Sequence, residues 1–165
     1  MAAGAARAGG EQRQYVTLGV DRDVFAVDVR MVNEILDMRP MARVPNAPPF
    51  LVGMIDVRGR NVPVIDLRTR LGLPPAVAAP QSRIVVLDAE VGGRELPLGL
   101  LADQVYEVTA LDGGRIEPPP EIGVRWRSEY IAGVGRRNGA FVIIFDLSRL
   151  LTSEETALLP EEAPG

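Results

Sequence analysis

The sequence repeats itself, and this duplication constrains the fold more than any other feature. Three segments of the first half recur in the second half, two of them 80 positions further along the chain and the third 73 positions further along. The matched segments are Phe50 to Met54 with Tyr130 to Val134, Val62 to Leu67 with Val142 to Leu147, and Val32 to Ile35 with Val105 to Val108. Such a repeat predicts two similar units of about 65–70 residues, each near the lower size limit for a stable core.

The chain is expected to divide between the two copies of the repeat. A run rich in Pro and Ala, residues 73–80, lies between the copies and is typical of a linker or of a loop between subdomains. The first residues are small and weakly basic, and they lack the apolar segment of a signal peptide. The expected divisions are a disordered tail at 1–14, one domain at 15–159 with approximate halves 15–72 and 81–159, and a C-terminal tail at 160–165.

Both halves have the texture of a mainly β protein. Short aliphatic and β-branched runs are separated by Gly, Pro, Asn and Asp, and no long segment with a helical period lies between them, which indicates a sandwich or a barrel. The predicted strands are Tyr15 to Val20, Val24 to Val29, Val62 to Leu67, Arg83 to Leu87, Leu96 to Leu101 and Ala140 to Leu147.

Tight turns and a few short helices complete the predicted fold. The turns are expected at 20–23, 58–61 and 137–139, and Asn138-Gly139 is the strongest of them because both residue types tolerate a positive φ. The predicted helical segments follow Pro48-Pro49, span Leu67 to Leu71 with Gly72 after the end, and lie near the C-terminus, where Thr152 to Glu155 resembles a capping box.

The composition excludes most enzyme mechanisms. The chain has no Cys and no His, and all 18 of its basic residues are Arg, so the usual nucleophiles, bases and transition-metal ligands are missing. Carboxylate acid/base chemistry, a serine without a His partner, and an all-oxygen Mg²⁺ or Ca²⁺ site remain open. The carboxylates Asp66 and Asp146 occupy equivalent repeat positions at strand ends, where capping of a helical turn explains them better. We therefore predict no catalytic residue, no cofactor and no metal.

A nucleic-acid-binding module is a further alternative. Arg125-Trp126-Arg127 places two cations beside the only Trp, which could stack on a base. A formal charge of −4 and an aromatic content of 5% argue against this alternative, because such modules carry basic patches and aromatic platforms. Trp126 is better explained as a residue that anchors a loop, and we expect no nucleic-acid partner.

Two consecutive motifs resemble the signature of the CheW family, the coupling proteins of bacterial chemotaxis. The first is Phe50 to Gly59, and the second is Val62 to Arg68. The resemblance extends from about Tyr15 to Leu159 through further segments that follow in order. These segments are Val32 to Ile35, Arg43 to Asn46, Glu129 to Gly133 and Leu150 to Glu155.

The resemblance implies a fold and a function. The implied fold is two packed SH3-like five-stranded β-barrel subdomains with a few short helices. The implied function is that of a non-enzymatic cytoplasmic adaptor that couples the cytoplasmic tips of transmembrane chemoreceptors to a CheA-type histidine kinase. It would be recruited to the inner face of the membrane through receptors, without membrane insertion, and could join CheW rings. A scaffold of a non-flagellar kinase array, for type IV pilus or gliding motility, is the alternative, and an SH3-like nucleic-acid-binding module is a more remote one.

The resemblance also implies binding residues, and Arg58 is the first of them. Its guanidinium can hold a carboxylate or backbone carbonyls in a fork and lie over an apolar groove, which suits contact with a receptor helix. Asp56, where the family commonly has Asn, is placed to pair with Arg58. The implied receptor-binding residues are Arg58, Glu34, Val32, Val29 and Gly59; the implied kinase-binding residues are Glu117 and Ile122; and the glycines matched to the groove between the barrels are Gly53, Gly99 and Gly133.

Overall fold

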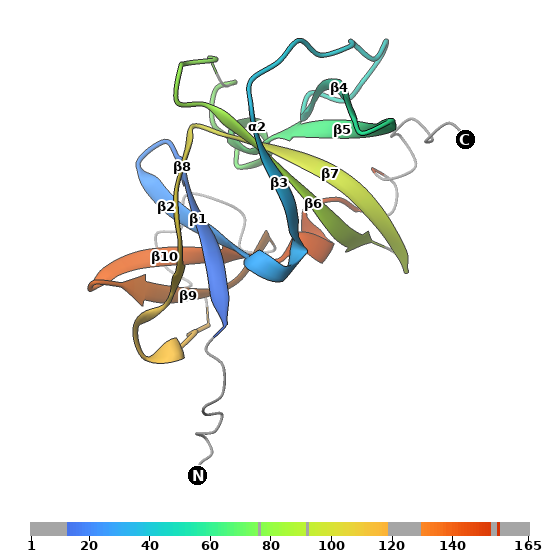
Figure 1. Ribbon diagram of the computed structural model, residues 1–165. Helices are drawn as coiled ribbons and strands as arrows, with labels where there is room; N and C mark the ends of the chain where they lie inside the picture. The colour runs from blue at the N-terminus through green and yellow to red at the C-terminus, as the bar shows by residue number, and fades with distance from the viewer. Residues whose placement is uncertain (1–12, 76, 92, 119–129, 153–154, 156–165) are drawn as a thin grey trace.

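Two curled five-stranded sheets make up the protein (Figure 1). The computed structural model describes residues 13–75, 77–91, 93–118, 130–152 and 155. One sheet, which we call the terminal sheet, has the strand order β8-β1-β2-β10-β9, and the other, the central sheet, has the order β3-β6-β7-β5-β4. These sheets confirm the predicted mainly β class.

The ten strands of the described residues are short, as the punctuated sequence predicts. Their bounds are β1 Gln14–Val20, β2 Asp23–Asp28, β3 Val32–Asp37, β4 Leu51–Val57, β5 Arg60–Asp66, β6 Arg83–Val91, β7 Arg94–Ala102, β8 Gln104–Ala110, β9 Ile131–Arg137 and β10 Ala140–Phe145. No helix in the described part of the chain is long and apolar enough to cross a bilayer.

Two-residue turns fix the register of the hairpins. Val57 pairs with Arg60 across the turn Arg58-Gly59, and both turn residues have positive φ, 55° and 84°. The turn Asn138-Gly139 between β9 and β10 has nearly the same values, 52° and 82°. A positive φ at both central positions matches the right-handed twist of the flanking strands. The predicted turns at these positions are confirmed.

Each sheet takes strands from both copies of the repeat. The first copy contains β1 to β5 and the second contains β6 to β10, yet β1 and β2 pair with the second copy's β8 and β10. In the same way β3 and β5 pair with β6 and β7. The chain crosses between the sheets at the 3-10 turn η1 (Val29–Met31) and again at Asp103, the one residue between β7 and β8. Figure 1 shows the blue β2 beside the orange β10.

This exchange of strands corrects the expected division of the chain. Residues 73–80 connect the short helix after β5 to β6, and both strands belong to the central sheet. The segment is therefore a loop within one sheet, and the expected halves 15–72 and 81–159 are copies in sequence without being separate bodies in space. Pairing between residues 35 to 118 positions apart leaves no local signal. Of the expected tails, Gln14 already belongs to β1, and residues 1–12 and 160–165 lie outside the described part.

Carboxylates cap the helical turns at equivalent positions of the two repeats. The Asp66 side chain accepts a hydrogen bond from the Arg68 amide at the start of α2 (Leu67–Arg70), and Asp146 does the same for Ser148 in η4 (Leu147–Arg149). Gly72, with φ 83°, ends α2 as predicted. A further 3-10 turn, η2, spans Asp112–Gly114.

Two other helix predictions have different outcomes. The prediction of a helix after Pro48-Pro49 is wrong, because the chain there makes only a turn before β4. The capping box is confirmed: the Thr152 amide donates to Glu155 Oε1 at 2.9 Å, and the Glu155 amide donates to Thr152 Oγ1 at 3.0 Å. The residues that would continue this helix lie outside the described part.

The main core lies between the sheets and joins the two repeats. Phe25 on β2 is fully buried, and its ring stacks on that of Phe145 on β10 with the centroids 4.7 Å apart. Smaller apolar clusters fill the inside of each curled sheet. Folding of either sheet therefore requires side chains from both repeats.

Candidate functional site

Arg58 projects from the turn between β4 and β5. Its side chain is 79% exposed, and its Nε donates a hydrogen bond of 2.6 Å to Glu34 Oε2 on β3. The turn holds Arg58 at a positive φ, which is uncommon for a residue with a side chain. The structure thus brings together two of the residues implied as receptor-binding.

Asp56 does not pair with Arg58. Its Oδ1 instead accepts a hydrogen bond of 2.8 Å from the Gly59 amide and closes the turn. The expectation of an Asp56–Arg58 pair is therefore wrong, because a side chain three residues before a turn glycine is well placed to bind its backbone amide. Arg58 is left to reach Glu34 across the sheet edge.

The Arg58–Glu34 pair keeps both groups charged. The hydrogen bond from Arg58 lowers the pKa of Glu34, and the carboxylate raises the pKa of Arg58. Both groups face solvent, so the pair adds little to stability. It presents a fixed cation and a fixed anion side by side on the surface.

A shallow depression of about 350 Å³ lies beside this pair. Val62 and Val86, both almost fully buried, line it together with Val57 and Pro97. Charged and polar groups surround these apolar residues, namely Asn33, Glu34, Arg58, Arg60 and Asp88. A depression whose lining combines apolar and charged residues suits an amphipathic helix.

The same type of pair recurs on the terminal sheet. Arg137 Nε donates to Glu107 Oε2 at 3.3 Å, and Glu107 is the repeat counterpart of Glu34. Each pair bridges the two edge strands of its sheet, β3 to β4 and β8 to β9, across the open side of the curled sheet. Sequence reasoning missed the second pair, although the repeat had already aligned the two glutamates.

The remaining residues implied for the receptor lie apart from the charged pair or support it. Gly59 is the second residue of the Arg58 turn. Val29 lies in η1 and Val32 begins β3, and both are half-buried and pack against the main core. Their contacts give them a packing role.

The three glycines implied for the groove lie where other groups approach the backbone closely. A Cβ on Gly53 would lie 2.8 Å from the Ala42 carbonyl oxygen, and one on Gly133 would lie 2.7 Å from that of Glu117. At both places an outlying segment pairs with the strand, Ala42 with Met54 and Glu117 with Val134. A Cβ on Gly99 would lie 2.9 Å from Ile84 Cγ2. Close packing therefore accounts for all three.

A second candidate surface surrounds Glu117. Phe141 on β10 is 60% exposed, with the Arg136 guanidinium 4.4 Å from its ring centre, and Ile116 is 42% exposed. Glu117, Arg136 and Phe141 help to line a depression of about 370 Å³. Ile122 and Trp126 lie outside the described residues.

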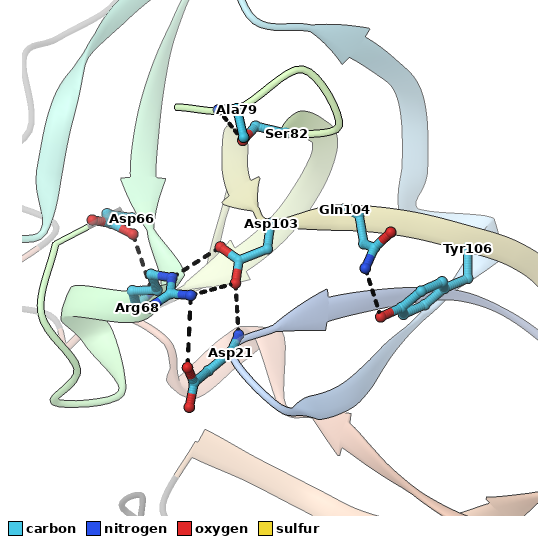
Figure 2. A network of polar contacts seen from close by, with 8 residues as sticks. All are labelled: Asp21, Asp66, Arg68, Ala79, Ser82, Asp103, Gln104 and Tyr106. Carbon is cyan, nitrogen blue, oxygen red and sulfur yellow. Dashed lines mark hydrogen bonds and ion pairs between the residues drawn. The ribbon is translucent and has the colours of Figure 1, made fainter. Parts of the chain in front are cut away.

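A polar network joins the two sheets at the crossing residue Asp103 (Figure 2). Arg68 in α2 binds the Asp103 carboxylate through Nε at 2.9 Å and Nη2 at 2.7 Å, and the Asp21 amide donates to the same carboxylate at 2.7 Å. Asp21 belongs to the β1–β2 turn of the terminal sheet, whereas Arg68 follows β5 of the central sheet. The network therefore ties the sheets together.

Replacing Asp103 by Asn is expected to lower the free energy of unfolding by about 1.5–3 kcal/mol at neutral pH, because charge-assisted hydrogen bonds are weakened. Partial burial raises the pKa of Asp103, but hydrogen bonds from Arg68 and the Asp21 amide outweigh it and hold that pKa below its usual value of 3.8. A carboxyl with a lower pKa in the folded state stabilises above its unfolded pKa and loses that effect as the pH falls through the folded value. Urea unfolding should show the full difference above about pH 5 and a shrinking one below pH 3.8.

A matched control for this pH dependence is Asp37→Asn. Asp37 is 87% exposed and lies 3.4 Å from Arg83, so its replacement should change stability by less than about 0.5 kcal/mol at any pH. An Asp103→Asn effect that stays constant from neutral to strongly acidic pH would contradict the account of the network.

The chain is similar to proteins of known role. The family model described as the CheW-like domain matches residues 14–155. Chemotaxis protein CheW of Klebsiella aerogenes is 32% identical over 93% of this chain and 89% of that protein, and that of Bacillus subtilis is 29% identical over 91% and 94%. The solved structure of the scaffolding protein TtCheW from Thermoanaerobacter tengcongensis matches with a TM-score of 0.77 and 27% identity, over 90% of this chain and 93% of that chain.

Proposed function

This chain belongs to the CheW family of chemotaxis proteins, and from that premise we propose that it couples the cytoplasmic tip of a transmembrane chemoreceptor to a CheA-type histidine kinase. It acts as an adaptor in the cytoplasm, without catalysis of its own, and reaches the membrane through the receptor. The relatives described above are named chemotaxis proteins, which favours this role over a scaffold for pilus or gliding motility. The observation that carries the proposal is the Arg58–Glu34 pair beside an apolar depression on a CheW-like fold.

Receptor binding is assigned to the surface around Arg58. A receptor helix that docks here would place apolar side chains over Val57 and Val62. Arg58 can keep one nitrogen on Glu34 and offer the others to a receptor carboxylate or carbonyl, because only its Nε donates to Glu34. Gly59 keeps the turn in its positive-φ conformation and so aims the side chain.

Kinase binding is assigned to the surface around Glu117. The exposed Phe141 supplies an apolar anchor, and Glu117, which lines the same depression, supplies a negative charge. This surface is formed by the terminal sheet and its outlying segment, whereas Arg58 belongs to the central sheet. Two partners can therefore bind at the same time, as coupling requires.

Replacing Glu117 by Arg is expected to weaken binding of the kinase regulatory domain by about 5- to 30-fold, because the charge at the border of the interface is reversed. Binding of the receptor fragment should not change. Isothermal titration of each partner separately gives both affinities, and size-exclusion chromatography with light scattering detects the ternary complex. The fold should persist, because Glu117 bonds Val134 only through its backbone.

Glu90→Arg serves as the control, because Glu90 is an exposed residue of β6 in the central sheet. It introduces the same charge change on the other sheet from Glu117 and should leave the affinity for the kinase unchanged. Equal losses in the two variants would assign the effect to net charge, and binding of the wild-type chain to neither partner would overturn the proposed function.

A further inference from the structure

Apart from the pairing within each hairpin, every strand pairing in the two sheets joins one repeat to the other. Within a repeat the paired strands are β1 with β2, β4 with β5, β6 with β7, and β9 with β10. The remaining pairings are β1 with β8, β2 with β10, β3 with β6, and β5 with β7, and all four join the first repeat to the second. A repeat without its counterpart would hold only separate hairpins and an unpaired strand.

These contacts have the symmetry of a dimer. The antiparallel contact of β3 with β6 matches that of β8 with β1, and the parallel contact of β5 with β7 matches that of β10 with β2. Each contact thus occurs twice with the roles of the repeats exchanged. That is the pattern of an isologous interface between two copies of one chain.

The buried side chains follow the same division. Phe25 and Ile65 come from the first repeat, Phe145 and Leu100 come from the second, and all four belong to the main core. The network of Arg68 and Asp21 with Asp103 also spans the two repeats. An isolated two-stranded hairpin is at best marginally stable in water, so a single repeat cannot retain its strands.

The connection between the repeats adds little to these contacts. Residues 74, 75, 77, 78 and 80 are exposed, and none of the described residues between 73 and 82 belongs to a strand. Near the end of the connection, the Ala79 amide donates to Ser82 Oγ at 2.9 Å, as Figure 2 shows. The connection acts mainly by keeping the repeats close, at an effective concentration of about millimolar for a short flexible link.

We infer that the two repeats bind each other as separable partners, so that a second copy of this chain can supply either repeat and complete both sheets. At micromolar concentration the intact chain closes on itself, because its own repeat is favoured about a thousandfold by the link. Cutting the connection removes the preference of each repeat for its own partner. The contacts between the two repeats remain.

The test is a full-length chain that carries a protease site after Val77, folded first and cut afterwards. The two pieces are expected to elute together in native buffer and to separate only in denaturant. The thermal midpoint of the cut protein should rise with protein concentration, whereas that of the uncut protein should not. Pieces that separate in native buffer, or a midpoint independent of concentration, would overturn the inference.

Exchange between copies is measured by unfolding and refolding two cut proteins together. One carries an affinity tag on the first repeat, and the other carries an isotope label in the second. After joint refolding of an equal mixture, about half of the second repeats that are purified with the tagged first repeat should carry the label. When the two cut proteins are mixed without unfolding, the labelled fraction should be far smaller. Absence of labelled pieces after joint refolding would contradict exchange. These results do not depend on receptor or kinase binding, so the proposed function stands or falls separately.

Discussion

Replacing Arg58 by Glu is expected to weaken binding of the receptor's cytoplasmic fragment by about 5- to 150-fold, equivalent to about 1–3 kcal/mol. The substitution removes the exposed guanidinium and places a second carboxylate beside Glu34, so a receptor carboxylate meets repulsion in place of a fork of donors. Isothermal titration with the purified fragment measures the loss. The free energy of unfolding should change by less than about 1 kcal/mol, because the side chain is 79% exposed.

Arg137→Glu is the matched control for this result. It breaks the Arg137–Glu107 pair, which bridges the edges of the terminal sheet as Arg58–Glu34 bridges those of the central sheet. If Arg58 acts by contact with the receptor, only the Arg58 variant loses affinity. Equal losses of receptor affinity in the two variants would mean that binding depends on an ion pair between the edges of a sheet, and not on contact of Arg58 with the receptor.

A charge exchange separates the two roles of Arg58 further. The double variant Glu34→Arg, Arg58→Glu restores an ion pair across β3 and β4 but moves the cation from the turn to the strand. It should restore any stability lost in Arg58→Glu while leaving receptor binding weak. Recovery of binding in the double variant would contradict a direct contact by Arg58.

Replacing Phe25 by Ala is expected to lower the free energy of unfolding by about 3–5 kcal/mol, the usual cost of removing a large buried aromatic side chain. Phe25 is fully buried and stacks on Phe145, so the substitution opens a cavity where strands of the two repeats meet. Urea unfolding followed by circular dichroism measures the change. In the cut protein the same substitution should also weaken association of the two pieces.

Phe141→Ala is the control for the core substitution. It removes the same side chain from a position that is 60% exposed, where only the contact with Arg136 is lost, so stability should fall by less than about 1 kcal/mol. Similar costs at the two positions would contradict the account of a core that joins the repeats.

The sequence predicts local features of this fold well. Turns at Arg58-Gly59 and Asn138-Gly139, the end of α2 at Gly72 and the capping box at Thr152 are all confirmed, because each depends on a few adjacent residues. Strands β3 and β8 were not predicted, because β3 places Asn, Glu and Asp at an exposed edge and β8 exposes Tyr, Glu and Val. Strands β4 and β9 were not predicted either, because glycines and charged residues interrupt their apolar runs.

The exchange of strands between repeats could not be predicted from periodicity. The repeat indicates that the protein contains two similar sheets. The sequence pattern is the same whether each sheet is built from one copy of the repeat or from strands of both copies. What decides between them is the path at η1 and Asp103, where one to three residues carry the chain from one sheet to the other. Such short crossings carry no distinctive residue type.

The charged pair at the candidate site was predicted in part. The resemblance singled out Arg58 and Glu34 separately, and the structure places Arg58 Nε, in the β4–β5 turn, 2.6 Å from Glu34 Oε2 on β3. Asp56 was expected to compete for Arg58, but its bond to the Gly59 amide is more local. The counterpart pair of Arg137 with Glu107 was missed, because the matching arginine lies one position before the repeat equivalent of Arg58.

The most direct test of the coupling role is phosphorylation of the kinase in the presence of receptor-containing membranes, with and without this protein. The account predicts that receptor control of kinase activity appears with the wild-type chain and Arg137→Glu, and is largely lost with Arg58→Glu. Receptor control that is equally strong without the protein, or no binding of the wild-type chain to either partner, would contradict the account.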